Sequence, residues 1–226
     1  MKILALETST DLCSVALLSD GELNERSQSA AHAHAELILP MVEALLAEAG
    51  IALAQLDALA FGRGPGAFTG VRVATAVVQG LAFGADRPVV PVSDLMALAA
   101  GAHRKHGARR VLACVDARLQ EVYWCAYEAA AADKLVECVA EQLSAAEAVQ
   151  PPTGCWFGAG SGFAAYRQPL LAQIGSVLDG RDDTLLPEAR DIALLAARLF
   201  AEGHAVRAEA ALPVYLRERV ATPKAL

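Results

Sequence analysis

Two carboxylates stand where this chain could carry out phosphate chemistry. Glu7 and Asp116 each close an apolar run that favours a buried strand. A carboxylate at such a strand end can act through a metal when the next turn lets backbone N–H groups approach a phosphate, which glycine permits. The turns that follow, residues 7–11 and 116–118, contain no glycine. We therefore interpret both as structural turns, and a working ATPase remains the alternative.

A glycine-rich segment, residues 62–70, is the most unusual stretch of the sequence. It runs Gly-Arg-Gly-Pro-Gly-Ala-Phe-Thr-Gly, without the Gly-Lys-Ser/Thr of a Walker A loop or the spacing of a dinucleotide loop. A strand-to-helix turn of this kind presents free N–H groups at a helix N-terminus, where they can hold an anion. The candidate nucleotide or anion residues are Gly64, Gly66, Thr69 and Gly70. A tight connection that binds nothing is the open alternative.

No complete catalytic or metal-binding set can be recognised in the sequence. His32 with His34, and His103 with His106, lack the H-E-x-x-H spacing and an evident third ligand. The five cysteines are scattered and form no C-x-x-C pair, so neither a zinc site nor a disulfide framework is indicated. We expect no catalytic residue, no metal and no cofactor of its own.

The composition of the chain limits which partners and which cellular compartment are expected for it. The 226 residues are 55% hydrophobic and carry a formal net charge of −7. A protein that binds nucleic acid by itself usually has a basic face, so any nucleic-acid contact is expected to depend on another protein. No apolar run reaches the roughly 18 residues of a membrane helix, and Glu7 comes too early for a signal peptide. We expect a cytoplasmic protein that does not enter a membrane.

Hydrophobic periodicity and turn residues place the elements. Strands are expected over residues 2–7, 13–18, 22–27, 58–62, 89–92, 111–116, 121–127, 135–138 and 155–158. Helices are expected over residues 34–49, 70–84, 94–105 and 187–202. Thr69 and Ser93 are predicted N-caps, and residues 144–147 a capping box that opens a short helix.

The element order repeats within the chain. The run at 111–116 resembles the run at 3–7, and each is followed, after a short turn, by a second strand. We predict two α/β lobes, residues 1–105 and 106–226, the second less regular. A strand meander followed by alternating helices and strands is typical of ribonuclease-H-like lobes, and two such lobes form the actin-like ATPase (ASKHA) architecture.

Two early helices are apolar over more than one face. A helix of this kind must be covered nearly all round. One face can pack on the lobe's own sheet, while small residues would let another helix come close. The candidate partner-binding residues are His34, Leu37, Ile38, Met41, Leu45, Val73, Ala74, Val77, Gly80 and Leu81. The partner could be a second copy or another protein, and burial within a larger lobe is the alternative.

Several segments together resemble one known family. They are Lys2–Ser9, His34–Leu46, Gly64–Arg72, Asp116–Arg118 with Glu121–Tyr123, and Pro213–Arg217. The chain is similar over these segments to the TsaB (YeaZ) family, and the Gly-Pro-Gly-x-Phe-Thr-Gly block is specific for it. The resemblance covers the chain from end to end and is thinnest between about residues 130 and 200.

The resemblance implies a function and a set of partners. It implies a non-catalytic scaffold subunit for threonylcarbamoyladenosine modification of tRNA beside the anticodon. It implies a TsaD-type catalytic subunit, which transfers the threonylcarbamoyl group, and a TsaE-type ATPase. ATP, ADP and metal are then expected in those partners, and tRNA binds only through the complex. The N-terminal helices of the family pair with those of the partner, and a homodimer is expected as an option when the chain is alone.

Two departures from the family pattern bear on nucleotide. Glu7 stands where the family more often has Asp, and Ala67 where it usually has Ser. Both weaken a claim that this lobe handles nucleotide. Two alternatives remain open: an independent actin-like ATP-dependent phosphotransferase, and a metal-dependent glycoprotease-like (M22) peptidase, for which the metal pair of that group is missing here.

Overall fold

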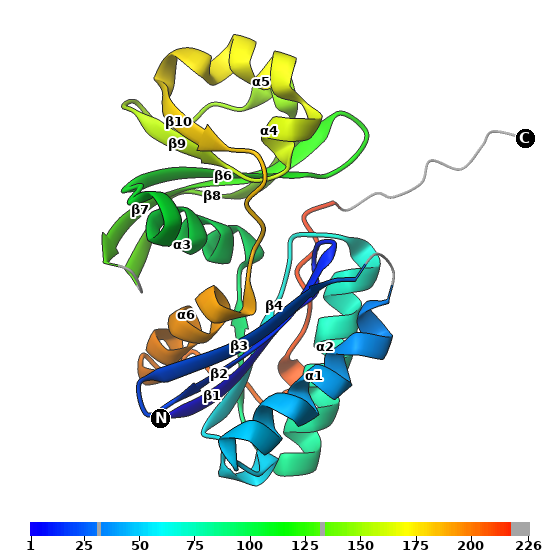
Figure 1. Ribbon diagram of the computed structural model, residues 1–226. Coiled ribbons are helices and arrows are strands. Elements are labelled where there is room, and N and C mark those ends of the chain that lie inside the picture. The colour runs from blue at the N-terminus through cyan, green and yellow to red at the C-terminus, as the bar shows by residue number, and fades with distance from the viewer. Residues whose placement is uncertain (31–32, 132–133, 218–226) are drawn as a thin grey trace, which may run out of the picture.

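The computed structural model describes residues 1–30, 33–131 and 134–217, and it contains two lobes, each built on a five-stranded sheet (Figure 1). The first sheet has the strand order β3-β2-β1-β4-β5 and the second the order β10-β9-β6-β7-β8. The first sheet consists of β1 (Lys2–Glu7), β2 (Leu12–Ser19), β3 (Glu22–Ser29), β4 (Ala58–Gly62) and β5 (Val89–Val92). The second consists of β6 (Arg110–Asp116), β7 (Glu121–Ala131), β8 (Lys134–Ala145), β9 (Trp156–Ala159) and β10 (Leu178–Asp182).

The two sheets have the same topology. In each, three antiparallel strands form a meander, and the first of them also pairs in parallel with the fourth strand, which pairs in parallel with the fifth. The predicted α/β fold of two ribonuclease-H-like lobes is therefore confirmed. The first meander turns at Asp20 and Gly21, whose positive φ angles of 52° and 93° suit a tight hairpin.

The helices and short turns complete the lobes. The helices are α1 (His34–Ala49), α2 (Phe68–Ala85), α3 (Asp94–His106), α4 (Gly162–Ala165), α5 (Arg167–Ile174) and α6 (Ala189–Ala201). Turns of 3-10 helix lie at η1 (Leu53–Gln55), η2 (Ala146–Ala148), η3 (Gly175–Val177) and η4 (Ala208–Ala210). Helix α3 follows β5 and leads into β6, so it joins the two sheets.

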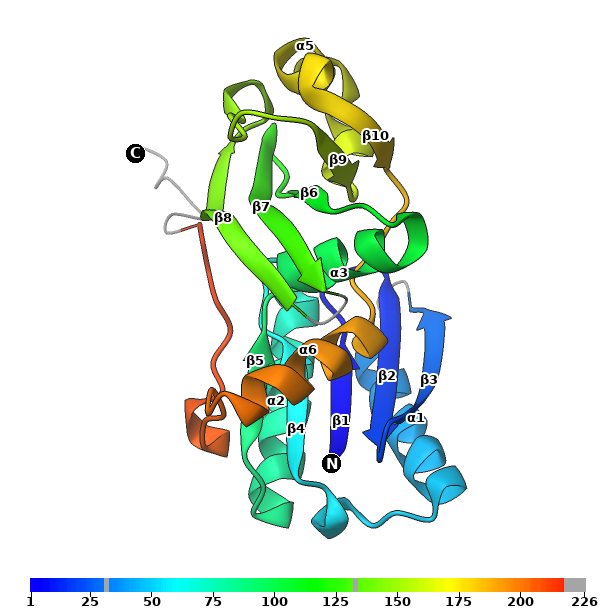
Figure 2. The ribbon, with the colours of Figure 1, turned by 90° about the vertical axis from the view of Figure 1, so that its left-hand side faces the viewer.

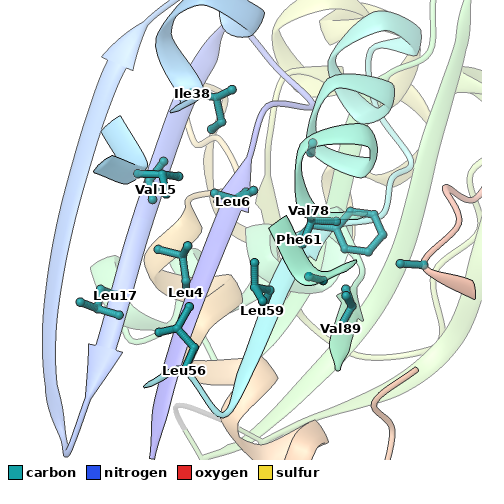
Figure 3. Packing of buried hydrophobic residues seen from close by; sticks show 14 of the residues in the cluster. Leu4, Leu6, Val15, Leu17, Ile38, Leu56, Leu59, Phe61, Val78 and Val89 are labelled. Atoms are coloured by element: carbon teal, nitrogen blue, oxygen red, sulfur yellow. The ribbon is translucent and has the colours of Figure 1, made fainter. Parts of the chain in front are cut away.

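The first sheet is covered on both faces. Because strand side chains alternate, Leu4 and Leu6 face α1 and α2, whereas Ile3 and Ala5 face the opposite side. The first face packs with Ile38, Phe61 and Val78, as Figure 3 shows. The second face is covered by α6, which lies across the sheet in Figure 2. Buried strands of this kind are expected to be continuous apolar runs.

Helix α6 does not belong to the second lobe as predicted. The prediction assigned residues 106–226 to that lobe, but Ile192, Leu195 and Ala196 pack on the first sheet with Ile3 and Ala5. The physical reason is that α6, together with Ala97 and Ala100 of α3, buries this face of the first sheet. The sequence pattern predicts this helix, but it does not show which sheet the helix covers.

Several local predictions differ from the structure. Helix α2 begins at Phe68, so Thr69 lies inside its first turn and does not cap it. The predicted capping box at 144–147 is a single 3-10 turn, because the Ser144 hydroxyl accepts a hydrogen bond from the Trp124 indole at 2.9 Å. Ser93 is confirmed as an N-cap, accepting from the backbone N of Met96 at 3.1 Å. Helix α5 and strand β10 have no counterpart among the predicted elements.

Candidate functional site

The glycine-rich segment packs tightly against the turn after β1. Gly64 has a φ of 98°, and a Cβ there would lie 2.9 Å from the carbonyl oxygen of Val214. A Cβ on Gly66 would lie 2.6 Å from the Cβ of Ser9, and one on Gly70 would overlap the carbonyl oxygen of Thr8. Real Cβ atoms do not make such contacts. The glycines are therefore explained by close backbone packing, whether or not an anion binds.

Polar groups of this segment are used within the fold. The backbone N–H of Gly64 donates to Asp94 Oδ2 at 2.6 Å, and that of Ala67 donates to the Ser9 carbonyl at 2.8 Å. The hydroxyl of Thr8 donates to the Gly70 carbonyl at 2.7 Å. These bonds reduce the number of free donors, so the anion site at Gly64, Gly66, Thr69 and Gly70 stays a prediction. Thr69 itself is exposed.

Glu7 points into the protein, where it meets Asp94, a residue with no role predicted from the sequence. Its side chain is fully buried beside Asp94, at the first position of α3. Burial raises the pKa of Glu7, and burial followed by the charge of Glu7 raises the pKa of Asp94 well above its usual value. Asp94 follows the cap Ser93, and the only sequence signal for it was an acidic residue in the first turn of a helix.

A cleft of about 830 Å³ lies between the lobes. Its walls are the turn after β1, the start of α2, the turn after β6 and part of the C-terminal segment. Neither Glu7 nor Asp94 lines it. The carboxylate of Asp116 accepts from the Arg118 backbone N at 2.7 Å and from the Tyr166 hydroxyl at 2.9 Å. Both strand-end carboxylates are thus held by protein groups.

The C-terminal segment crosses from one lobe to the other beside this cleft. The backbone N of Val214 donates to the Arg63 carbonyl at 2.8 Å in the first lobe. Arg217 donates to the Ala117 carbonyl at 2.8 Å in the second lobe. Between them, the Arg72 guanidinium lies 3.1 Å from the ring centre of Phe68 and 4.7 Å from that of Tyr215. Such cation–π contacts stabilise the segment across the cleft mouth.

The helix pair α1 and α2 divides into a buried face and an outer face. Ile38, Leu45 and Ala74 are buried in the first lobe's own core, so their prediction as partner contacts is wrong. Hydrophobic periodicity alone could not show how much of the apolar surface of α1 and α2 packs against the first sheet. The Nε2 of His34 lies 2.7 Å from the Thr10 carbonyl, so this side chain bonds to the turn after β1.

The remaining predicted contacts lie toward the surface. Leu37, Met41, Val73, Val77 and Leu81 are half-buried, and Gly80 is exposed. Two large side chains that were not predicted from the sequence also lie there: Leu39 is 41% exposed and Phe83 is 81% exposed. We call the exposed residues Leu39, Ala76, Gly80, Phe83 and Gly84 the outer face. Its α2 residues are small or apolar and uncharged, whereas Leu39 on α1 lies between the exposed Glu36 and Glu43.

Helix α2 is also long and apolar enough to cross a membrane, judged by length and composition alone. A core helix of a soluble protein meets the same criterion, so this is weak evidence for a span. About a third of the helix is buried within the protein. Its remaining apolar surface contributes to the outer face.

The histidines and cysteines do not gather at one point in the described part of the chain. No group of three or more His, Cys, Asp or Glu side chains suited to a metal occurs there. The Nδ1 of His103 lies 2.9 Å from the Ala108 carbonyl, and His106 pairs with Asp182 at 2.8 Å. His32 lies outside the described residues.

Comparison with known proteins decides the family. A family model described as "TsaD: tRNA N6-adenosine threonylcarbamoyltransferase" matches residues 25–224. The tRNA threonylcarbamoyladenosine biosynthesis protein TsaB of Escherichia coli K12 is 43% identical, over 99% of this chain and 98% of that protein. The protein of the same name from Haemophilus influenzae is 41% identical, over 99% and 97%. This chain belongs to the TsaB family.

Solved structures agree with the TsaB assignment. YeaZ from Pseudomonas aeruginosa superposes with a TM-score of 0.87 and 46% identity, over 95% of this chain and 99% of that one. A second structure, described as similar to peptidase YEAZ from Pseudomonas aeruginosa, gives a TM-score of 0.90 and 47% identity, over 96% and 99%. The resemblance to the TsaB (YeaZ) family and the actin-like ATPase type of fold are both confirmed.

Proposed function

We propose that this protein is the accessory subunit that binds and activates a TsaD-type catalytic subunit in threonylcarbamoyladenosine modification of tRNA. The full-length likeness to two proteins named for the biosynthesis of this nucleoside carries the proposal. The outer face of α1 and α2 supports a partner role. The exposed apolar positions of α2, with Leu39 of α1 beside exposed glutamates, are typical of a surface that another protein covers.

The occupant of the outer face is a helix pair of the TsaD-type subunit. Gly80 and Gly84 leave open space above α2, into which another helix can approach closely. When the partner is absent, a second copy can cover the same face, which gives a homodimer. A TsaE-type ATPase joins the assembly, and tRNA is held through the complex because the chain itself is acidic.

The chain is non-catalytic on this proposal. Glu7 is turned away from the interlobe cleft toward Asp94, and Asp116 is held by Arg118 and Tyr166. Asp116 lines the cleft, but because these bonds already occupy its carboxylate, it is not free to bind a metal–phosphate group. ATP, ADP and metal belong to the partner subunits, and the complex works in the cytoplasm.

The cleft volume favours one alternative, an independent actin-like phosphotransferase. About 830 Å³ is within the range of small-molecule sites. Titration calorimetry of the chain alone with magnesium-ATP separates the two functions. We expect no binding heat up to about 1 mM nucleotide, because the strand-end carboxylates Glu7 and Asp116 are already bonded within the protein. Saturable binding well below that concentration would favour the phosphotransferase over the accessory subunit.

A further inference from the structure

Two acidic side chains meet inside the first lobe without a basic residue between them. Glu7 at the end of β1 and Asp94 at the start of α3 both have no exposed surface. A Cβ added to Gly62 would overlap both Glu7 Oε2 and Asp94 Oδ1. The two oxygens therefore meet over the same glycine, and Gly62 leaves the space that they occupy.

The two facing carboxylate oxygens of Glu7 and Asp94 lack a hydrogen-bond donor. The outer oxygen of each carboxyl group is satisfied: Glu7 Oε1 accepts from the Ser9 backbone N, and Asp94 Oδ2 accepts from the Gly64 backbone N. The facing oxygens, Glu7 Oε2 and Asp94 Oδ1, are buried and have no hydrogen-bond partner. Buried polar atoms are normally bonded, and two ionised carboxylates have no donor to offer each other.

The buried Ser9 hydroxyl is an unpartnered donor beside Glu7, but Asp94 Oδ1 receives no bond from it. Most of the other neighbouring groups are bonded elsewhere. Arg63, after β4, forms a bidentate pair with Glu141 at 3.1 and 3.2 Å. His34 on α1 bonds to the Thr10 carbonyl. Cys13 on β2 is a buried thiol whose pKa is raised to about 11 by burial and by Glu7. The Tyr127 hydroxyl on β7 lies 3.5 Å from Ser93 Oγ.

We propose that Glu7 and Asp94 share one proton at neutral pH, as a carboxylic acid bonded to a carboxylate. The proton supplies the missing donor and leaves the pair with one negative charge. The pKa of each carboxyl group is raised, which is the direction that a retained proton requires. Such pairs titrate as a unit, so the proton belongs to the pair and not to one residue.

The shared proton fixes three segments of the first lobe to one another. Glu7 holds the turn after β1 through Ser9, and Asp94 holds the glycine-rich segment through Gly64. Asp94 also opens α3, the helix that leads into the second sheet. The hydrogen bond between the two carboxyl groups therefore ties together the turn after β1 and the glycine-rich segment, both of which line the interlobe cleft. A charge-assisted hydrogen bond of this kind is stronger than a neutral one.

Infrared spectroscopy of the full chain at pH 7 tests the shared proton. We expect the C=O band of a protonated carboxyl group in the folded wild type, and its loss in both Glu7→Gln and Asp94→Asn. Each amide donates an N–H in place of the proton, so the remaining carboxyl group becomes ionised. Asp191→Asn is the matched control: Asp191 is also buried, but it is paired with Arg104 at 2.9 and 2.7 Å, so the band should persist.

Absence of this band in the wild type overturns the proposal, as does its persistence in both amide variants. If neither variant folds, labelling the side chains of the wild type with carbon-13 assigns the band. A band that shifts with neither labelled glutamate nor labelled aspartate also overturns it.

The pH dependence of unfolding gives a second measurement. Because the pKa of each carboxyl group is raised in the folded state, the native protein holds more protons than the unfolded chain above about pH 4. Stability is therefore lost as the pH rises toward the folded pKa. For one proton, the unfolding equilibrium constant of the wild type should increase by up to about tenfold per pH unit more than that of Glu7→Gln. Equal slopes would contradict a proton held only in the native state.

Discussion

Replacing Gly80 by leucine is expected to weaken the complex with a TsaD-type subunit by about 10- to 100-fold, while the chain stays folded. A Cβ at Gly80 meets nothing within 4 Å, so the lobe itself accommodates the side chain. Leucine also has a better helix propensity than glycine. In the complex, the same side chain overpacks the contact with the partner's helix, and overpacking typically costs about 1–3 kcal/mol. Sedimentation or calorimetry with the purified partner measures the change in Kd.

A matched variant on another helix separates the interface effect from a general one. Ala201 is an exposed small residue at the end of α6, on the opposite side of the first sheet. Ala201→Leu should bind the partner like the wild type. Ala74→Leu would be uninformative, because Ala74 is buried and the variant overpacks the lobe's own core. Wild-type affinity of Gly80→Leu would remove α2 from the proposed interface.

Replacing Gly70 by alanine is expected to destabilise the chain by about 3 kcal/mol or to prevent folding, although the substitution raises helix propensity. The new Cβ overlaps the carbonyl oxygen of Thr8, which is backbone and cannot rotate away. The Thr8 hydroxyl also bonds to the Gly70 carbonyl, so the turn after β1 and the start of α2 cannot separate freely.

Gly80→Ala is the control for this substitution, since it lies in the same helix in open space. At Gly80 the substitution changes only the helix propensity, so the free energy of unfolding should rise by up to about 1 kcal/mol. Urea unfolding of both variants and the wild type measures the two changes in the free energy of unfolding. A Gly70→Ala variant within about 0.5 kcal/mol of the wild type would show that the turn is not tightly packed against α2.

The repeated strand meander could be predicted because each of its causes is local. The run at 2–7 is apolar throughout, Asp20 and Gly21 suit a tight turn, and β4 was predicted with the bounds that the structure shows. Alternation and turn residues act over a few positions, so they are visible in sequence. The prediction of the second sheet was less complete. Strand β10 was not predicted, because it is half-buried and carries Asp179, Arg181 and Asp182.

The placement of α6 and the contact of Asp94 with Glu7 could not be predicted, because both depend on residues far apart in the chain. The apolar face of α6 could pack on either sheet, and only the assembled fold shows that it packs on the first one. Asp94 looks like an ordinary acidic residue in a first helical turn, which the helix dipole favours. That it meets Glu7, 87 positions earlier in the chain, follows from the register of β1, β4 and β5.

The candidate interface was predicted in part. Periodicity correctly gave two helices with more apolar surface than one stripe, but it could not separate Ile38, Leu45 and Ala74, which the sheet buries, from Gly80. Phe83 was missed because it lies at the end of α2, where its exposure depends on how the helix sits on the sheet. The proposed outer face therefore rests on burial, which the sequence alone does not contain.

Reconstitution tests the accessory-subunit function most directly. Purified TsaD-type subunit, TsaE-type ATPase, tRNA, ATP and a source of threonylcarbamoyl-adenylate are combined with and without this chain, and the modified nucleoside is counted by mass spectrometry. Our account predicts product only when the chain is present, and none from the chain without the TsaD-type subunit. Equal product without the chain would contradict a required accessory role, and product from the chain alone would contradict a non-catalytic one.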